Sequence, residues 1–192
     1  FLPLVSADGI INHVGIIIYD VTDMAVNKLE LADANEELAR LSRTDRLTDL
    51  YNRGFWEECL AFEFERYKRS KQPCCLIMFD IDHFKKVNDS YGHPAGDEVI
   101  RQTARTLRLT IRKTDIAGRY GGEEFGVILV NTKREEALIF SERFRKRIEA
   151  LTVRHDDLKI KYTISLGIAE LTDDMPEYKQ WLSGTDQALY SS

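Results

Sequence analysis

The sequence lacks a basic excess and a long apolar segment, and each absence excludes a class of protein. Its 192 residues include 27 Lys and Arg against 32 Asp and Glu, so the net charge is −5. This balance argues against a dedicated nucleic-acid-binding protein, which carries a basic face. The longest uncharged stretch, residues 9–19, contains Asn12 and His13 and is about half as long as the roughly 20 residues of a membrane-spanning helix. We therefore expect no nucleic-acid partner and no membrane segment within the chain.

Cysteine is also scarce, and the cysteines that occur form no recognisable pattern. Cys59, Cys74 and Cys75 cannot all pair with one another, and no Cys-x-x-Cys spacing is present. We interpret them as free, buried thiols of a protein in a reducing compartment rather than as metal ligands. Residues 1–6 lack the basic region and the cleavage site of a signal peptide. These observations predict a cytoplasmic protein.

Hydrophobic residues, in contrast, are present in the proportion of a folded protein. With 43% hydrophobic and 10% aromatic residues, the chain can bury a sizeable core. Domains contain roughly 150 residues, so the length predicts one domain and a fragment. The fragment is at the start, where an Asp8-Gly9 turn precedes a β-branched strand pattern at residues 14–19. Such a piece is too short to form a core of its own.

Residues 24–41 have a helical pattern with a seven-residue repeat. The repeat positions are occupied by Met24, Asn27, Leu31, Ala34, Leu38 and Leu41. An amphipathic helix packed against its own domain would give this pattern. A short parallel coiled coil between two protomers would give it as well, with the buried asparagine fixing the register. The sequence leaves both interpretations open.

From residue 45 onward, helical and strand patterns alternate. We expect helices at residues 53–71, 94–112, 133–151 and 177–190, with one helical turn at 84–87 and a loop at 88–92. We expect strands at residues 74–81, 115–119, 125–130 and 160–170. The Gly121-Gly122 pair between two of these strands indicates a hairpin, although glycine also allows a ligand to approach the backbone closely. The alternation predicts an α/β sandwich with a hairpin in its sheet.

Pairs of carboxylates stand at the end of one strand and after the hairpin glycines. Asp80 and Asp82 close the apolar strand, and their side chains point to one face because strand side chains alternate. Glu123 and Glu124 follow the glycine pair. If the strand and the hairpin are neighbours, these acids meet at one edge of the sheet and repel one another unless a cation is present. Mg²⁺ suits such a site, whereas acids at solvent-exposed strand ends are the alternative for either pair alone.

A run of seven residues resembles the signature of a known family. The run Arg119-Tyr120-Gly121-Gly122-Glu123-Glu124-Phe125 is similar to the signature of diguanylate cyclases, the GGDEF family, in its GGEEF form. Further segments resemble family motifs in the family's order, at residues 45–53, 79–89, 91–97, 163–169 and 186–190. The resemblance implies a nucleotidyl-cyclase, palm-like α/β (α+β sandwich) fold, with a central, mostly antiparallel sheet of about five strands flanked by helices.

The resemblance also implies an activity and a metal site. Such enzymes join two GTP molecules into cyclic di-GMP and release two pyrophosphates, and they work as a homodimer because each site holds one GTP. Asp80, the main-chain carbonyl of Ile81 and Glu123 would bind Mg²⁺, with Mn²⁺ as a substitute ion, and the metal would neutralise phosphate charge. Glu124 would either be a further metal ligand or help to deprotonate the attacking 3′-hydroxyl.

The rest of the substrate is expected to contact a turn and two helices. Asn88 and Asp97 would accept hydrogen bonds from the guanine edge. His93 is a secondary candidate for a substrate contact. The main-chain amides that would meet the β- and γ-phosphates, as a helix N-terminus does, belong to His83, Phe84 and Lys85.

An inhibitory product site is implied ahead of the glycine pair. Arg112 and Asp115 match the family's Arg-x-x-Asp motif, in which the guanidinium and the carboxylate suit guanine and phosphate groups. Arg143 matches an accessory arginine of that site, and Arg66 matches one that the partner protomer supplies. Arg112 also continues a basic stripe on the preceding helix, and such a stripe is usually only solvated.

The two ends of the chain complete the expected organisation. Residues 8–23 resemble the last strands of a PAS-type sensor and residues 24–44 a signalling helix, so we expect a sensor fragment at 1–22, a helical linker at 23–44 and the cyclase domain at 45–192. The family's last helix continues with a lysine and an arginine that contact the triphosphate, whereas this sequence ends at Ser192. We therefore expect the domain to be truncated at its C-terminal end. A catalytically silent module that binds cyclic di-GMP and a dimerising relay are the alternative functions.

Overall fold

A computed structural model describes residues 2–5, 11–15, 43–156 and 158–190. The chain forms two compact units, Phe1–Leu41 and Ser42–Ser192. In the first unit, β1 (Leu2–Val5) and β2 (Ile11–Gly15) form an antiparallel pair. β2 therefore starts before the predicted strand at residues 14–19, and the rest of that strand lies outside the described residues. The helix predicted at residues 24–41 lies outside them as well.

The second unit contains an antiparallel sheet in the order β4-β5-β3-β8, which are Ile116–Arg119, Glu124–Val130, Cys74–Ile81 and Ile164–Glu170. The central strand β3 is the continuous apolar run of the sequence, and its first six residues are buried. The described sheet has four strands where about five were expected. A separate hairpin, β6 (Val153–His155) and β7 (Leu158–Ile160), was not predicted.

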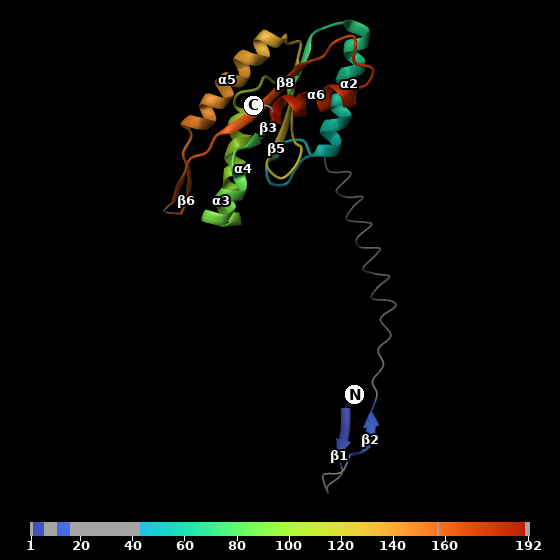
Figure 1. Cartoon of the computed structure of the whole chain (residues 1–192), viewed down its shortest axis with the longest axis vertical. Helices are drawn as coiled ribbons and strands as arrows, with labels where there is room; N and C mark the ends of the chain where they lie inside the picture. The colour runs from blue at the N-terminus through green and yellow to red at the C-terminus, as the bar shows by residue number, and fades with distance from the viewer. Residues whose placement is uncertain (1, 6–10, 16–42, 157, 191–192) are drawn as a thin grey trace. The chain divides into compact units, whose positions relative to one another are not determined.

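Helices cover both faces of this sheet (Figure 1). The five described helices are α2 (Arg53–Ser70), α3 (Phe84–Tyr91), α4 (His93–Arg108), α5 (Arg134–Ala150) and α6 (Tyr178–Tyr190). On β3, Cys75, Ile77 and Phe79 pack with α3, α4 and α5. The alternate residues Leu76 and Met78 pack with α2 and α6. The predicted mixed α/β architecture with an antiparallel sheet is therefore confirmed.

A pair of glycines makes room for the largest side chain on the α2 face. Gly118 and Gly126 lie opposite each other on β4 and β5. A Cβ atom on either residue would lie 2.6 Å or 2.2 Å from the indole ring of Trp56, which is well below van der Waals contact. Trp56 is only 1% exposed. The two glycines therefore let α2 pack closely on the hairpin strands.

Two predicted boundaries differ from the structure for local physical reasons. The predicted loop at residues 88–92 is mostly helical, because α3 continues to Tyr91 and ends at Gly92, whose φ of 83° favours glycine. The buried residues Phe84 and Val87 hold this helix on the core. The predicted strand at 160–170 is divided, because Ile160 belongs to β7 and β8 begins only at Ile164. Among the described residues, no helix is long and apolar enough to cross a membrane.

Candidate active site

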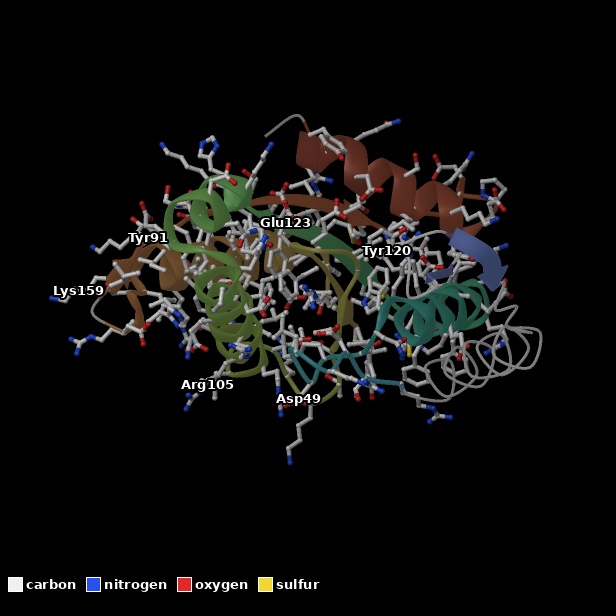
Figure 2. The ribbon with its side chains drawn as sticks, turned by 90° about the horizontal axis from the view of Figure 1, so that it is seen from below. Asp49, Tyr91, Arg105, Tyr120, Glu123 and Lys159 are labelled. Atoms are coloured by element: carbon white, nitrogen blue, oxygen red, sulfur yellow. The ribbon has the colours of Figure 1, made fainter. Side chains whose placement is uncertain are left out.

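The carboxylates singled out in the sequence meet at one end of the sheet. Asp80 on β3 lies directly opposite Glu124 on β5 and opposite Ser165 on β8. Residues that lie opposite each other on neighbouring strands project to the same face. By the alternation along β3, that face is the one that α2 and α6 cover. Glu123 directly precedes β5 and lies between α3 and α6 (Figure 2).

These acids influence one another. Burial raises the pKa of Asp80 above its usual value, and the neighbouring Asp82 and Glu123 raise it further. Burial also raises the pKa of Glu124, with further contributions from Asp186, Glu123 and Asp80, while Arg53 lowers it. Like charges that share a partly buried site disfavour ionisation. The cluster therefore holds more negative charge than its own protein surroundings neutralise.

A groove with a volume of about 620 Å³ opens beside these acids. The side chains and main chain that line it come from the end of β3, the start of α3, the hairpin, β8 and the end of α6. The lining residues are Asp80, Ile81, Asp82, His83, Phe84, Lys85, Glu123, Ser165, Leu189 and Tyr190. The structure thus brings together the predicted metal ligands Asp80, Ile81 and Glu123 with the three residues predicted to meet the phosphates.

Asp82 has different partners from Asp80. Its carboxylate accepts hydrogen bonds from the hydroxyl groups of Thr163 and Ser165, the latter at 2.7 Å. Its main-chain amide donates to the carbonyl oxygen of Thr163. Asp82 therefore fastens the turn after β3 to the start of β8, and it is less available to a ligand than Asp80 is.

The donor set fits a hard divalent cation. Carboxylate and carbonyl oxygens are the ligands that Mg²⁺ prefers, and Mg²⁺ commonly takes only one or two carboxylates from the protein. Within the described part of the chain, no three His, Cys, Asp or Glu side chains converge on one point as a complete metal cage. Asp80 and Glu123 in the groove, together with the carbonyl of Ile81, would suit an ion that completes its coordination with substrate and water.

Arg119 fixes the hairpin turn that precedes the two glutamates. Its guanidinium donates to the carbonyl oxygens of Gly121 and Gly122, at 3.2 Å and 2.7 Å. A Cβ on Gly121 would lie 2.5 Å from the Glu124 carboxylate, so glycine is needed for the observed position of that side chain. Gly121 thus leaves space for the carboxylate of Glu124 beside the turn.

The predicted guanine-binding residues lie where α3 meets α4. The Oδ1 atom of Asn88 would be 2.0 Å from a Cβ on Gly96, so only glycine at this position accommodates the asparagine. Asp97 follows Gly96 directly on α4, and both Asn88 and Asp97 are half-buried. His93 is exposed at the start of α4. Asn88 and Asp97 therefore lie on adjacent helices, but neither lines the groove of the carboxylates.

A second pocket holds most of the predicted inhibitory-site residues. Arg112, Asp115 and Arg143 line a cavity of about 240 Å³ together with Ile139 and Phe140. Asp115 accepts a hydrogen bond from the amide of Arg112 at 2.9 Å. Its other carboxylate oxygen is buried. Burial raises the pKa of Asp115, and the main-chain amides of Arg112 and Val130 lower it.

Arg66 does not lie in this pocket of its own chain. Its guanidinium donates to Glu63 at 2.7 Å and also to Gln72 and Asn131. Glu63 is only 6% exposed, so the pair stabilises α2 from inside. These contacts engage the side chain that was expected to reach a partner protomer.

Two residues that shape the electrostatics of the site were not predicted from the sequence. Asp186 on α6 is the largest charged influence on Glu124. Arg53 on α2 donates to the hydroxyl of Tyr120 at 3.0 Å and lies over its ring, 4.3 Å from the centroid. Asp186 belongs to a segment with family resemblance, but a single acid on a helix predicts no role. Only the packing of α2 and α6 on the sheet reveals these positions.

Comparison with protein families identifies a match over most of the chain. Residues 42–192 match the model described as diguanylate cyclase, GGDEF domain. The chain is 37% identical over 163 residues to Probable diguanylate cyclase DgcC of Escherichia coli (strain K12), an alignment that covers 85% of this chain and 44% of that protein. The chain thus spans less than half the length of this curated relative.

Solved structures share the fold. The GGDEF domain of DgcB from Caulobacter crescentus, in complex with c-di-GMP, is 31% identical with a TM-score of 0.75, covering 78% of this chain and 86% of that chain. Diguanylate cyclase SiaD from Pseudomonas aeruginosa, in complex with its activator SiaC, is 36% identical with a TM-score of 0.75, covering 88% and 64%. Both alignments extend over more than three quarters of the present chain.

Proposed function

The chain belongs to the diguanylate cyclase family that the GGDEF domain defines, and we propose that it condenses two GTP molecules into cyclic di-GMP with its GGEEF hairpin. The observation that carries the proposal is the position of Asp80 directly opposite Glu124, with Glu123 beside them at a groove of about 620 Å³. A groove of this size accommodates a nucleotide. The acids supply the oxygen donors that a metal–triphosphate complex needs.

Asp80, the carbonyl of Ile81 and Glu123 would hold a divalent ion, Mg²⁺ in the first place with Mn²⁺ as a substitute. When bound, the ion supplies positive charge that stabilises the phosphate oxygens during displacement. Glu124 is suited to accept the proton of the attacking 3′-hydroxyl, because burial and neighbouring acids raise its pKa. It would serve as a metal ligand instead if its carboxylate turned away from Gly121.

The remaining predicted contacts would orient the nucleotide. The turn His83–Lys85 lines the groove at the start of α3, where main-chain amides are available to phosphate oxygens. Asn88 and Asp97 would accept the guanine N1–H and N2–H₂ groups, with His93 as a further contact. One such site holds one GTP, so the reaction requires a homodimer in which two sites face each other.

Product inhibition is proposed for the pocket of Arg112, Asp115 and Arg143. The Asp115 carboxylate that lines the pocket suits the N–H groups of a guanine base. The guanidinium groups suit guanine acceptors or phosphate. Arg66 would contribute from a partner protomer only after releasing Glu63 and Asn131.

The same pocket supports a second function, a catalytically silent effector that binds cyclic di-GMP. The observation in its favour is that none of the pocket residues lines the catalytic groove, so ligand binding does not require catalysis. The two functions differ in one measurement, because only the cyclase consumes GTP.

The domain assignments for the rest of the chain are proposals as well. We propose that residues 1–22 end a PAS-like sensor, that residues 23–44 form the signalling linker and that the cyclase domain begins at residue 45. The cytoplasmic location expected from the sequence also stays a prediction.

The test of the cyclase is turnover of GTP with Mg²⁺, followed by chromatography of cyclic di-GMP and a pyrophosphate assay. Asp80→Asn and Glu124→Gln should each reduce turnover by at least 100-fold, whereas Glu142→Gln on the exposed face of α5 should not change it. The rate should rise faster than linearly with protein concentration if two protomers are needed. Binding of cyclic di-GMP without any GTP turnover would reject the cyclase in favour of the effector.

A further inference from the structure

A second groove adjoins the catalytic one on the other side of the turn after β3. We propose that this groove, with a volume of about 550 Å³, binds a small phosphate-bearing ligand with a planar ring, of the nucleotide class. It lies between α3 and the segment that leads into β8, and it shares only Asp82 and His83 with the catalytic groove. Its size is within the range of ligand sites in proteins, roughly 300–1,000 Å³. The proposal does not depend on the cyclase reaction.

Positive charge is available in the groove. Lys86 on α3 and Lys161 before β8 both line it. Neither lysine forms an ion pair with another residue in the described ranges. Two lysines from different elements that line one groove, without carboxylate partners, are suited to a phosphate group.

The acidic side chains of the groove are already engaged. The carboxylate of Asp82 accepts hydrogen bonds from Thr163 and Ser165. Glu149, which also lines the groove, pairs with Arg145 at 3.0 Å. The groove therefore presents lysine charge that these acids do not cancel directly, which favours an anion over a metal ion or a cationic ligand.

The rest of the lining is apolar and aromatic. Val87 and the ring of Tyr162 are nearly buried and form part of the wall. The hydroxyl of Tyr162 forms a hydrogen bond with the hydroxyl of Thr103 at 2.8 Å, so it does not need a ligand as a hydrogen-bond partner. Tyr91, at the end of α3, lines the groove with a ring that is 41% exposed (Figure 2). An exposed ring beside two lysines suits a base that stacks while its phosphate meets the ammonium groups.

The test uses AMP and inorganic phosphate as probes, titrated by calorimetry into the whole chain in the presence of EDTA. EDTA removes the divalent ion on which nucleotide binding at the catalytic groove is expected to depend. The test variants are Lys86→Ala/Lys161→Ala and Tyr91→Ala. The control is Lys159→Ala, which removes one positive charge from β7 at an exposed residue that does not line the groove. All four side chains are exposed, and circular dichroism would verify that each variant is folded.

We expect AMP to bind more tightly than phosphate. The double lysine variant should weaken both probes at least tenfold, Tyr91→Ala should weaken only AMP, and Lys159→Ala should stay within twofold of wild type. The absence of AMP binding, or an equal loss in Lys159→Ala, would overturn the proposal. Asn88→Ala distinguishes the predicted guanine site: loss of AMP binding in that variant would also reject the groove, while retained binding supports it. GTP turnover plays no part in these readouts, so failure here leaves the cyclase proposal untouched.

Discussion

Arg119 joins Asp45, at the start of the second compact unit, to the hairpin that carries Glu123 and Glu124. Its guanidinium donates to the two carboxylate oxygens of Asp45 at 3.2 Å and 3.3 Å, and to the carbonyl oxygens of Gly121 and Gly122. Asp45 in turn accepts hydrogen bonds from the amide and the hydroxyl of Thr48. One planar side chain thus connects the first turn of the unit with the turn of the hairpin.

The first prediction concerns this connection. Arg119→Lys keeps the charge but cannot bridge a carboxylate and two carbonyl groups at once. We expect GTP turnover to fall about 10- to 100-fold, because a displacement of catalytic groups by about 1 Å has effects of this size. The free energy of unfolding should fall by about 1 kcal/mol, because lysine keeps the charge beside Asp45 but loses hydrogen bonds in a partly buried site.

Two further measurements make the Arg119 prediction specific. Hydrogen exchange at the amides of Tyr120 and Gly121, which both donate to the carbonyl of Glu124, should become faster in Arg119→Lys. Arg145→Lys is the matched control, because it disturbs the ion pairs with Glu142 and Glu149 on α5 without touching the hairpin. Unchanged turnover and exchange in Arg119→Lys would mean that the hairpin keeps its position without the bridge.

The second prediction concerns the space that glycine leaves for Trp56. Gly126→Ala places a methyl group about 2.2 Å from the indole, so α2 or the strand must move. Alanine is usually better than glycine in a strand by roughly 0.5–1 kcal/mol, but overpacking typically costs 1–3 kcal/mol. We expect a net loss of stability of about 1–2 kcal/mol in urea unfolding.

Gly184→Ala is the control for this prediction. Gly184 is exposed on α6, and a Cβ there would meet no atom within 4 Å. Alanine should therefore leave stability unchanged or raise it by up to about 1 kcal/mol through helix propensity. If Gly126→Ala were as stable as Gly184→Ala, the inference that Trp56 packs too closely on the sheet to admit a methyl group would be rejected.

The elements that the sequence predicted well are those whose pattern depends on local residues. β3 was predicted at its exact bounds because a central strand is apolar on both faces. The β4–β5 hairpin followed from the glycine pair between two strand patterns. The second half of α3 was missed because Asn88, Asp89 and Ser90 favour turns locally, whereas packing of Phe84 and Val87 keeps the segment helical.

The site was predictable where its residues belong to local sequence patterns. Asp80 and Glu123 stand at strand ends that can be located from the sequence, so their meeting in one groove could be expected. The influence of Asp186 on Glu124 depends on how α6 packs on the sheet, which no short pattern records. The groove of Lys86 and Lys161 likewise joins residues from different elements, and neither lysine is part of a local motif.

The third prediction concerns stability at alkaline pH. Burial raises the pKa of Tyr162 to about 12, above the value near 10 that it has in an unfolded chain. The unfolded state therefore loses the proton first, and the stabilising contribution is complete below pH 10 and is lost as the pH rises from 10 to 12. The loss should be on the order of 2 kcal/mol.

Tyr162→Phe isolates this effect. Below pH 10 the variant should be less stable by about 1 kcal/mol, since it lacks the hydrogen bond to Thr103. Thr103 still donates to the carbonyl of Val99, so no buried donor is left unpaired. Near pH 12 the order should reverse, because only the wild type gains the ionisation of Tyr162 on unfolding, whereas the other tyrosines are common to both proteins. Parallel stability curves for the two proteins across this range would contradict the prediction.

The last prediction concerns the three thiols. Cys74 and Cys75 have no exposed surface, and burial raises the pKa of both, that of Cys75 to about 12. At pH 8 the thiolate fraction of Cys75 is therefore on the order of 10⁻⁴, and only the thiolate reacts with iodoacetamide. Cys59 on α2 is partly accessible to solvent, and burial raises its pKa as well. Mass spectrometry after alkylation of the folded protein should show one modified cysteine, Cys59. In 8 M urea, which serves as the unfolded reference, all three cysteines should be modified. Rapid modification of Cys74 or Cys75 without denaturant would mean that β3 opens to solvent, which is incompatible with its position at the centre of the sheet.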